Sequence, residues 1–175
     1  AFSWPPIEAQ GPGTYTFDVI VTDNGTGSLS DSETITVTVN EGNLPPVLDP
    51  VGAQSIEELA ELTFDATASD LDVPADTLTF SLSGSVPAGA TITSGGSFSW
   101  TPTEAQGPDT HTFDVVVTDN GTGALSDSET IIVTVAEINV APVLDAVGNQ
   151  SIDELVELSF TATASDADLP ANTLT

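Results

Sequence analysis

Apolar side chains recur at every second position in short blocks along the chain, and Gly, Pro, Asn and Asp separate these blocks. Such alternation predicts half-buried β-strands in a sandwich or barrel, and helical periodicity is nearly absent. Within the central 96 residues the pattern predicts seven strands, around residues 54–59, 62–68, 78–82, 90–93, 98–100, 113–117 and 131–135. Residues 56–62 also have good helix propensity, but a helix there would leave the sandwich without its first edge strand.

The chain is an internal repeat with a period of 96 residues. Residues 1–79 align with residues 97–175 without a gap, and 58 of these 79 positions are identical. We therefore expect residues 1–44 to be the C-terminal part of one repeat, 45–140 a complete repeat and 141–175 the N-terminal part of the next, in an excerpt of a longer chain. A unit of this length can fold as a domain of its own. Proline at each boundary keeps one repeat's last strand from continuing into the next repeat.

The charge of the chain is extreme, because 27 Asp and Glu residues stand against no Lys, no Arg and one His. Binding to nucleic acid or to an anionic membrane requires cationic side chains, so both partners are excluded. Metal ions, hydrogen-bond donors and counterions remain to offset the repulsion between carboxylates. Such a charge is unusual for a cytosolic protein, so we expect an extracellular or cell-surface location. Two explanations of the charge are compatible with each other: it keeps a long extracellular polymer soluble, and it binds specific ions.

Cysteine is absent, which excludes disulfides and thiol redox chemistry. The longest apolar stretches are too short, and too often interrupted by Thr, to cross a membrane. We therefore expect no membrane insertion in this segment.

Several short motifs resemble a known class of repeats: Pro-Val-Leu, Gly-x-Gln-Ser-Ile, Ala-Thr-Ala-Ser-Asp-x-Asp, Leu-Thr-Phe-Ser-Leu, Pro-Ala-Gly-Ala, Phe-Ser-Trp-Thr-Pro-Thr, Gly-Pro-x-Thr-x-Thr-Phe-Asp-Val and Thr-Asp-Asn-Gly. The whole chain resembles the immunoglobulin-like and dystroglycan-type cadherin-like tandem repeats of large bacterial surface proteins and adhesins. The resemblance implies an all-β fold of tandem seven-stranded immunoglobulin/cadherin-like β-sandwiches. It says less about function, because such modules are spacers in adhesins and surface layers and also lie beside enzyme domains.

Cadherin-type repeats bind calcium between successive domains, and the resemblance extends to some of these positions. At the first boundary it implies Ca²⁺ ligands at Glu41, Asn43, Asp70, Asp72 and Asp119. At the second boundary the corresponding candidates are Glu137, Asn139, Asp166 and Asp168, and Glu58 (or Glu57) and Glu104 reach it from the preceding repeat. Clustered carboxylate and amide oxygens are the ligands that calcium prefers.

The chain departs from the cadherin pattern in its linkers. A further Asp-Asn pair is replaced by Leu44-Pro45 and by Val140-Ala141, the conserved acidic tripeptide is reduced to Glu104, and the Asn that follows the first-strand Glu is absent. We therefore expect at most one or two calcium ions per junction. A simpler interpretation is that Asp70 and Asp72 cap a strand and begin a turn.

The aromatic residues have structural interpretations. His111 occupies the position of Tyr15 in the other repeat, which favours a strand-edge aromatic over a catalytic base. Trp4 and Trp100 alternate with polar residues, which favours core packing over a sugar-stacking platform. The sequons at Asn24, Asn120 and Asn149 permit glycosylation, although turn chemistry explains the first two.

We therefore expect a structural or adhesive repeat segment of an extracellular stalk, filament or surface adhesin that is stiffened by calcium at the linkers, and no enzyme. Its partners would be neighbouring repeats of the same chain, other copies in a filament, or a cell-surface glycan or protein. Two alternatives stay open: a carbohydrate-binding module and an accessory domain of a secreted hydrolase. Polymerisation through exchanged strands ranks lower, because counterparts of residues 80–96 are missing from the two end segments.

Overall fold

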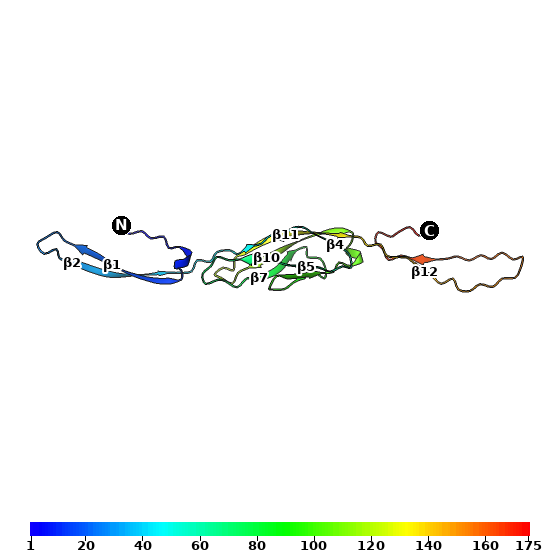
Figure 1. Cartoon of the computed structure of the whole chain (residues 1–175), viewed down its shortest axis with the longest axis horizontal. Helices are drawn as coiled ribbons and strands as arrows, with labels where there is room; N and C mark the ends of the chain where they lie inside the picture. Colours follow the sequence, from blue (N-terminus) through cyan, green and yellow to red (C-terminus); the bar gives the residue numbers. More distant parts are fainter.

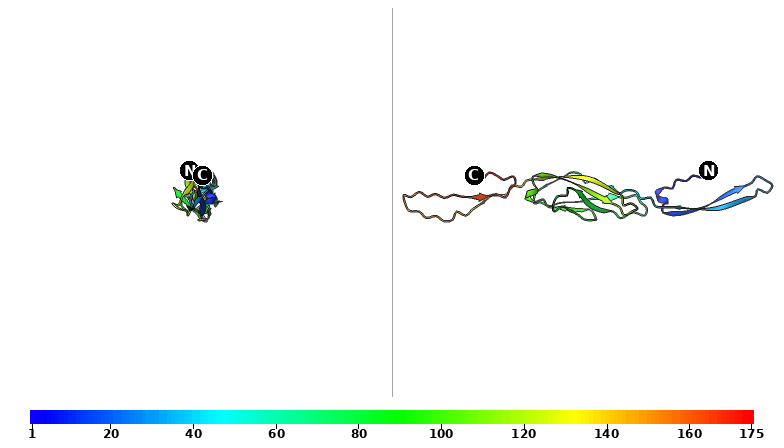
Figure 2. Two further views of the ribbon diagram at one scale, coloured as in Figure 1. Left: turned by 90° about the vertical axis from the view of Figure 1, so that its left-hand side faces the viewer. Right: turned by 180° about the vertical axis from the view of Figure 1, so that it is seen from behind.

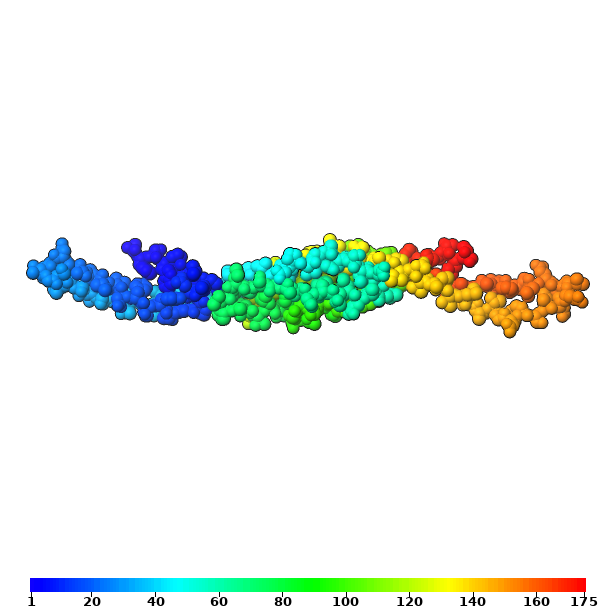
Figure 3. Space-filling view, in the orientation of Figure 1, coloured from blue at the N-terminus to red at the C-terminus, as the bar shows by residue number.

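The structure, a computed structural model, describes residues 1–175 and forms an elongated rod. A hairpin segment, a central sandwich and an open two-stranded segment follow one another along one axis (Figure 1). The end-on view is narrow, so the three parts lie in line (Figure 2). The space-filling view shows the sandwich as the widest part, with the linkers at its two poles (Figure 3).

Two sheets face each other in the central sandwich. The first has the order β4-β11-β10-β7, in which β4 runs parallel to β11 and the other neighbours are antiparallel. Its strands are β4 (Gln54–Glu57), β7 (Thr79–Gly84), β10 (Asp109–Thr118) and β11 (Ser126–Ala136). The second sheet, of order β5-β9-β8, contains β5 (Leu62–Asp65), β8 (Thr91–Ile92) and β9 (Ser97–Trp100). A two-stranded ribbon and a 3₁₀ turn complete the sandwich: β3 (Val47–Leu48), β6 (Ala68–Ser69) and η2 (Glu104–Gln106).

The core consists of the inward positions of the alternating strands. Its buried residues are Leu48, Leu62, Ala66, Phe98, Trp100, Phe113, Val115, Val117, Ile131, Val133 and Val135. Phe98 stacks on Phe64 and Phe113, with ring centroids 4.4 and 5.6 Å apart. Trp100 is 1% exposed, and its indole N–H donates to the Ala88 carbonyl at 3.2 Å. The indole of Trp100 therefore packs in the core, as its alternation with polar residues predicts, and offers no face for a sugar.

The observed strands follow the predicted ones, apart from the additional short strand β3 and differences at two predicted strands. The predicted strand at 54–59 ends at Glu57, because the next residues form a turn in which Leu59 has a φ of 60°. The Leu59 amide donates to the Pro102 carbonyl at 2.8 Å, which fixes this turn against the opposite side of the domain. The predicted strand at 62–68 divides into β5 and β6, which pair with different partners.

The flanking segments repeat parts of the sandwich. At the N-terminal end, η1 (Glu8–Gln10) precedes a hairpin of β1 (Gly13–Thr22) and β2 (Ser30–Val39), whose register matches that of β10 and β11. At the C-terminal end, β12 (Val143–Leu144) pairs with β13 (Ala164–Ser165) as β3 pairs with β6. None of the helical segments has the length and apolar character that a membrane span requires.

Candidate metal centre

Both linkers are held by an aspartate from the repeat that follows them. The Leu44 amide donates to the two carboxylate oxygens of Asp72 at 3.0 and 3.2 Å, and the Val140 amide donates to Asp168 at 2.9 Å. Both aspartates are buried, at 4% and 1% exposure. Each lies three residues after a short strand, so the same local fold places a buried negative charge at each junction.

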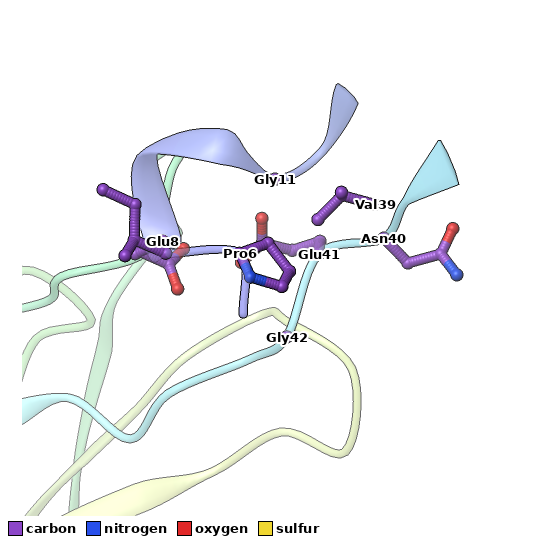
Figure 4. Close-up of a pocket in the computed structure, with 8 residues that line it drawn as sticks. Pro6, Glu8, Gly11, Val39, Asn40, Glu41 and Gly42 are labelled. Atoms are coloured by element: carbon purple, nitrogen blue, oxygen red, sulfur yellow. The ribbon is translucent and has the colours of Figure 1, made fainter. Parts of the chain in front are cut away.

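One acidic cluster at the first junction joins the two repeats. Glu8, Glu41 and Asp72 have carboxylate oxygens within 4.8 Å of one another, although η1, the linker and the following repeat supply them. Glu8 also accepts a hydrogen bond from the Val73 amide at 3.3 Å. Figure 4 shows Glu8 and Glu41 among the residues that line a small pocket between the η1 turn and the linker.

The cluster at the second junction contains Glu104 and Glu137, the counterparts of Glu8 and Glu41, together with Glu58, again with oxygens within 4.8 Å. Glu58 is fully buried, and one of its oxygens accepts the Ile138 amide at 3.1 Å. Glu104 accepts the Leu169 amide of the following repeat at 2.8 Å. This cluster is therefore also linked to both sides of its junction.

The turn after β4 determines which first-strand glutamate faces the junction. The Glu58 amide donates to the Ala136 carbonyl at 3.0 Å, and Leu59 adopts its positive φ directly afterwards, so Glu58 is buried and Glu57 stays exposed. Gly107 leaves room for the Glu58 carboxylate, because a Cβ at this position would overlap Glu58 Oε2. Of the two glutamates that the sequence offers, the structure places Glu58 in the cluster.

A second acidic cluster at the first junction consists of Asp70, Asp76 and Asp119. Asp119 is 5% exposed and accepts Gly121 N at 3.1 Å and Leu125 N at 3.0 Å. Its other oxygen accepts the side-chain amide of Asn43 at 3.1 Å. Gly121 permits this approach, since a Cβ there would overlap the Asn43 Oδ1 and Asp76 Oδ2 atoms.

Asp70 begins a turn, as the simpler interpretation of the sequence proposes. Its Oδ1 accepts the Asp72 amide at 2.9 Å, and Asp166 accepts the Asp168 amide at 3.1 Å in the same way. In both cases the bond uses one carboxylate oxygen, and Asp70 Oδ2 is buried without a partner. The turn therefore uses only one carboxylate oxygen of Asp70 and leaves the other without a hydrogen-bond partner.

One difference between the two junctions changes the polar groups around these aspartates. Asp76 of the first junction corresponds to Asn172 of the second. The Asn172 side-chain amide donates to Asp168 at 2.6 Å and to Asn139 Oδ1 at 3.1 Å. At the first junction Asn43 Oδ1, the counterpart of Asn139 Oδ1, has no hydrogen-bond partner.

All the buried side-chain oxygen atoms that lack a hydrogen-bond partner lie at the junctions. They are Asn43 Oδ1, Glu58 Oε2, Asp70 Oδ2 and both carboxylate oxygens of Glu137. A buried acceptor without a partner costs about 1–3 kcal/mol, so five such atoms in two places call for a positive group. An all-oxygen donor set of carboxylates and an amide fits Ca²⁺ better than a transition metal, which favours nitrogen or sulfur.

The electrostatics of these clusters agree with that donor set. Desolvation, and then the neighbouring carboxylates, raise the pKa of one residue in each cluster. These residues are Glu41 beside Glu8 and Asp72, Asp76 beside Asp72 and Asp119, and Glu137 beside Glu58 and Glu104. The chain has no Lys or Arg that could compensate for this repulsion.

The sequence-predicted residues all lie at the two junctions. The first holds Glu41, Asn43, Asp70, Asp72 and Asp119, and the second holds Glu58, Glu104, Glu137, Asn139, Asp166 and Asp168. Sequence reasoning missed Glu8, Asp76 and Asn172. The 96-residue shift from Glu104 could have found Glu8, whereas Asp76 and Asn172 belong to none of the motifs.

A family model described as "Putative Ig domain" matches residues 45–136, more than half of the chain. The chain belongs to this Ig-domain family. The matched residues of the Ig domain include all strands from β3 to β11, which confirms the predicted all-β, sandwich-like repeat. No curated protein matches the chain.

Solved structures similar to this Ig-domain chain are cadherin segments. Protocadherin gammaB7 EC3-6, described as a cis-dimer structure, has a TM-score of 0.53 and 19% identity over 93% of this chain and 44% of its own. PcdhgB3 EC1-4 has a TM-score of 0.58 and 20% identity over 94% and 43%. Human CDH23 EC21-23 has a TM-score of 0.51 and 22% identity over 89% and 58%. The chain thus spans about half the length of these structures, and the likeness establishes the fold.

Proposed function

We propose that this chain is a structural or adhesive segment of an extracellular stalk, filament or surface adhesin, with calcium at each junction between repeats. The repeats are residues 1–44, 45–140 and 141–175, and each is a spacer. The observation that carries this proposal is the position of the unpartnered buried side-chain oxygens, which all lie at the two junctions between repeats, beside polar groups of the adjoining repeat. Neighbouring repeats of the same chain are its first partners, and other copies or a surface glycan or protein are further ones.

The residues of each junction have distinct tasks in this proposal. Glu58, Glu104 and Glu137 supply the preceding repeat's carboxylates at the second junction, and Asp168 supplies one from the following repeat. At the first junction Glu8, Glu41 and Asp72 hold one cation, and Asp70, Asp76, Asp119 and Asn43 Oδ1 offer oxygens for a second. Bound calcium supplies the positive charge that these groups lack. The linker amides already bound to Asp72 and Asp168 keep the two repeats in register for it.

Calcium should therefore change both the stability and the bending of the rod. A cation that binds only the aligned folded state contributes about 2.7 kcal/mol at a concentration one hundred times its Kd. Small-angle X-ray scattering of the 175-residue chain should give a narrower distribution of end-to-end lengths in calcium than in chelator. Thermal unfolding should shift upward in parallel.

An Asp72→Asn variant should lose the calcium effect at the first junction. Asp49→Asn is the matched control, because Asp49 is an exposed carboxylate of the same repeat that accepts only the Thr67 hydroxyl, at 2.7 Å. Equal scattering and equal unfolding temperatures with calcium and with chelator, at constant ionic strength, would refute the calcium part of the proposal. A calcium response that is as large in Asp72→Asn as in wild type and Asp49→Asn would refute the assigned site at the first junction, because only the second junction should still respond in that variant.

A further inference from the structure

The turn that carries the junction glutamate is the same in both repeats, with the sequence Glu-Ala-Gln-Gly-Pro at residues 8–12 and 104–108. Its only internal backbone bonds in the second copy are Gln106 N to Thr103 O at 2.8 Å and Gly107 N to Glu104 O at 3.4 Å. A single 3₁₀ turn is too short to be stable on its own. Contacts with the rest of the repeat must therefore fix the backbone from which Glu8 or Glu104 projects.

A polar aromatic ring provides one such contact in each repeat. His111 Nε2 lies 2.8 Å from the Gln106 carbonyl oxygen, and because a carbonyl only accepts, Nε2 donates the proton. Tyr15 donates its hydroxyl to the Gln10 carbonyl at 2.9 Å. Two chemically different side chains thus deliver a donor to the same backbone position.

Both rings are held in the same way by a tryptophan. His111 packs edge-on against Trp100, with centroids 5.0 Å apart and an interplanar angle of 78°. Tyr15 packs against Trp4 at 4.9 Å and 81°. The shared geometry explains why the position accepts His or Tyr: an aromatic ring fills the space, and its terminal N–H or O–H reaches the turn.

The turn is tied to the cation cluster on its other side. Glu104 accepts the Leu169 amide at 2.8 Å, across the junction, and Glu8 accepts the Val73 amide at 3.3 Å. Gly107 lies against the Glu58 carboxylate, so a displaced turn would also displace the fully buried ligand candidate with the unpartnered Oε2. A shift of the Gln106 carbonyl would therefore change the arrangement of two carboxylates of the cluster.

We propose that His111 and Tyr15 are positioning residues, whose ring donors fix the Glu-Ala-Gln-Gly-Pro turn and so hold Glu104 and Glu8 at the calcium site of each junction. The inference rests on the proposed function and adds residues that contact no cation themselves. Removing an interaction that orients a metal ligand typically weakens metal binding about 10- to 100-fold.

The test uses His111→Phe and His111→Tyr in the 175-residue chain, with Tyr15→Phe as the reciprocal variant. Calcium titrations followed by NMR report each junction separately, through the Val140 and Leu169 amides for the second and the Leu44 and Val73 amides for the first. His111→Phe should raise the Kd of the second junction about 10-fold and leave the first unchanged, whereas His111→Tyr should keep the wild-type affinity. Tyr15→Phe should weaken the first junction alone.

A second readout separates this inference from the proposed function. In chelator, His111→Phe should speed the hydrogen exchange of the Leu169 amide, and His111→Tyr should not. If the wild-type chain binds no calcium but Leu169 responds in this way, the function fails and the positioning role stands. Wild-type affinity and exchange in His111→Phe, or equal weakening of both junctions by that variant, would overturn the positioning role.

Discussion

Replacing Glu58 with Gln should change the stability of the central repeat in opposite directions with and without calcium. In chelator, Glu58 is fully buried, and its Oε2 has no hydrogen-bond partner beside Glu104 and Glu137. Glutamine keeps an oxygen for the Ile138 amide and presents an N–H₂ group to the neighbouring carboxylates. Since an unpartnered buried acceptor costs about 1–3 kcal/mol, we expect the variant to gain about 1 kcal/mol, the lower end of this range. For a repeat of this size that gain raises Tm by about 4–8 °C.

Calcium should reverse the order of the two proteins. At one hundred times its Kd, calcium stabilises the wild-type chain by about 2.7 kcal/mol. If the loss of one carboxylate weakens binding about 100-fold, the same calcium concentration stabilises the variant by about 0.4 kcal/mol. The variant's total of about 1.4 kcal/mol then falls below the wild-type gain.

Thermal unfolding followed by circular dichroism, at low ionic strength with chelator and with calcium, measures both effects. Glu57→Gln is the matched control, because it removes the same charge from the adjacent, exposed side chain. It should change Tm little in either condition. A Glu58→Gln variant that is less stable than wild type in chelator, and that keeps the full calcium shift, would refute the reasoning.

Three further predictions concern the junctions and the turn after β4. Gly121→Ala should weaken calcium binding at the first junction, because its Cβ would overlap Asn43 Oδ1. Gly25→Ala is the control and should leave the calcium affinity unchanged, because its Cβ would lie 3.4 Å from its nearest neighbour. Calorimetric titration with calcium measures both affinities. In chelator, stability should be highest below the ordinary carboxyl pKa and fall as the pH rises through the raised pKa values of Glu41, Asp76 and Glu137. In that pH range the folded state binds more protons than the unfolded state, and losing those protons restores the repulsion between carboxylates. Unfolding scans from pH 4 to pH 7 that show rising Tm would contradict this. Leu59→Asn should raise Tm by a few degrees, since Asn tolerates the φ of 60° better than an exposed Leu, and an unchanged or lower Tm would mean that Leu59 is not strained.

Alternation in the sequence predicts the strands well, because a sandwich buries one face of each strand. Phe98 and Trp100, for example, lie in the core, as their spacing indicates. The end of the first strand was predicted two residues too late. Propensity and alternation do not reveal that the Leu59 amide bonds to the Pro102 carbonyl and turns the chain there.

The candidate site was predicted only where a motif or the repeat period marks it. Asp70 and Asp72 stand in a recognisable motif, and the 96-residue shift relates Glu41 to Glu137. Asp76 enters its cluster through the folding of the loop between β6 and β7, which brings it to Asp119, 43 residues later in the chain. The pattern of the sequence contains no signal for such a tertiary contact.

The parallel pairing of β4 with β11 has a mechanical consequence. The first strand of the main sheet and the last one are direct neighbours from Gln54 opposite Val133 to Glu57 opposite Ala136. Since the chain enters and leaves the sandwich at opposite poles, tension along the rod pulls these two strands in opposite directions along their common length (Figure 1). Their hydrogen bonds are then loaded in shear and must break together, instead of opening one after another like a zipper.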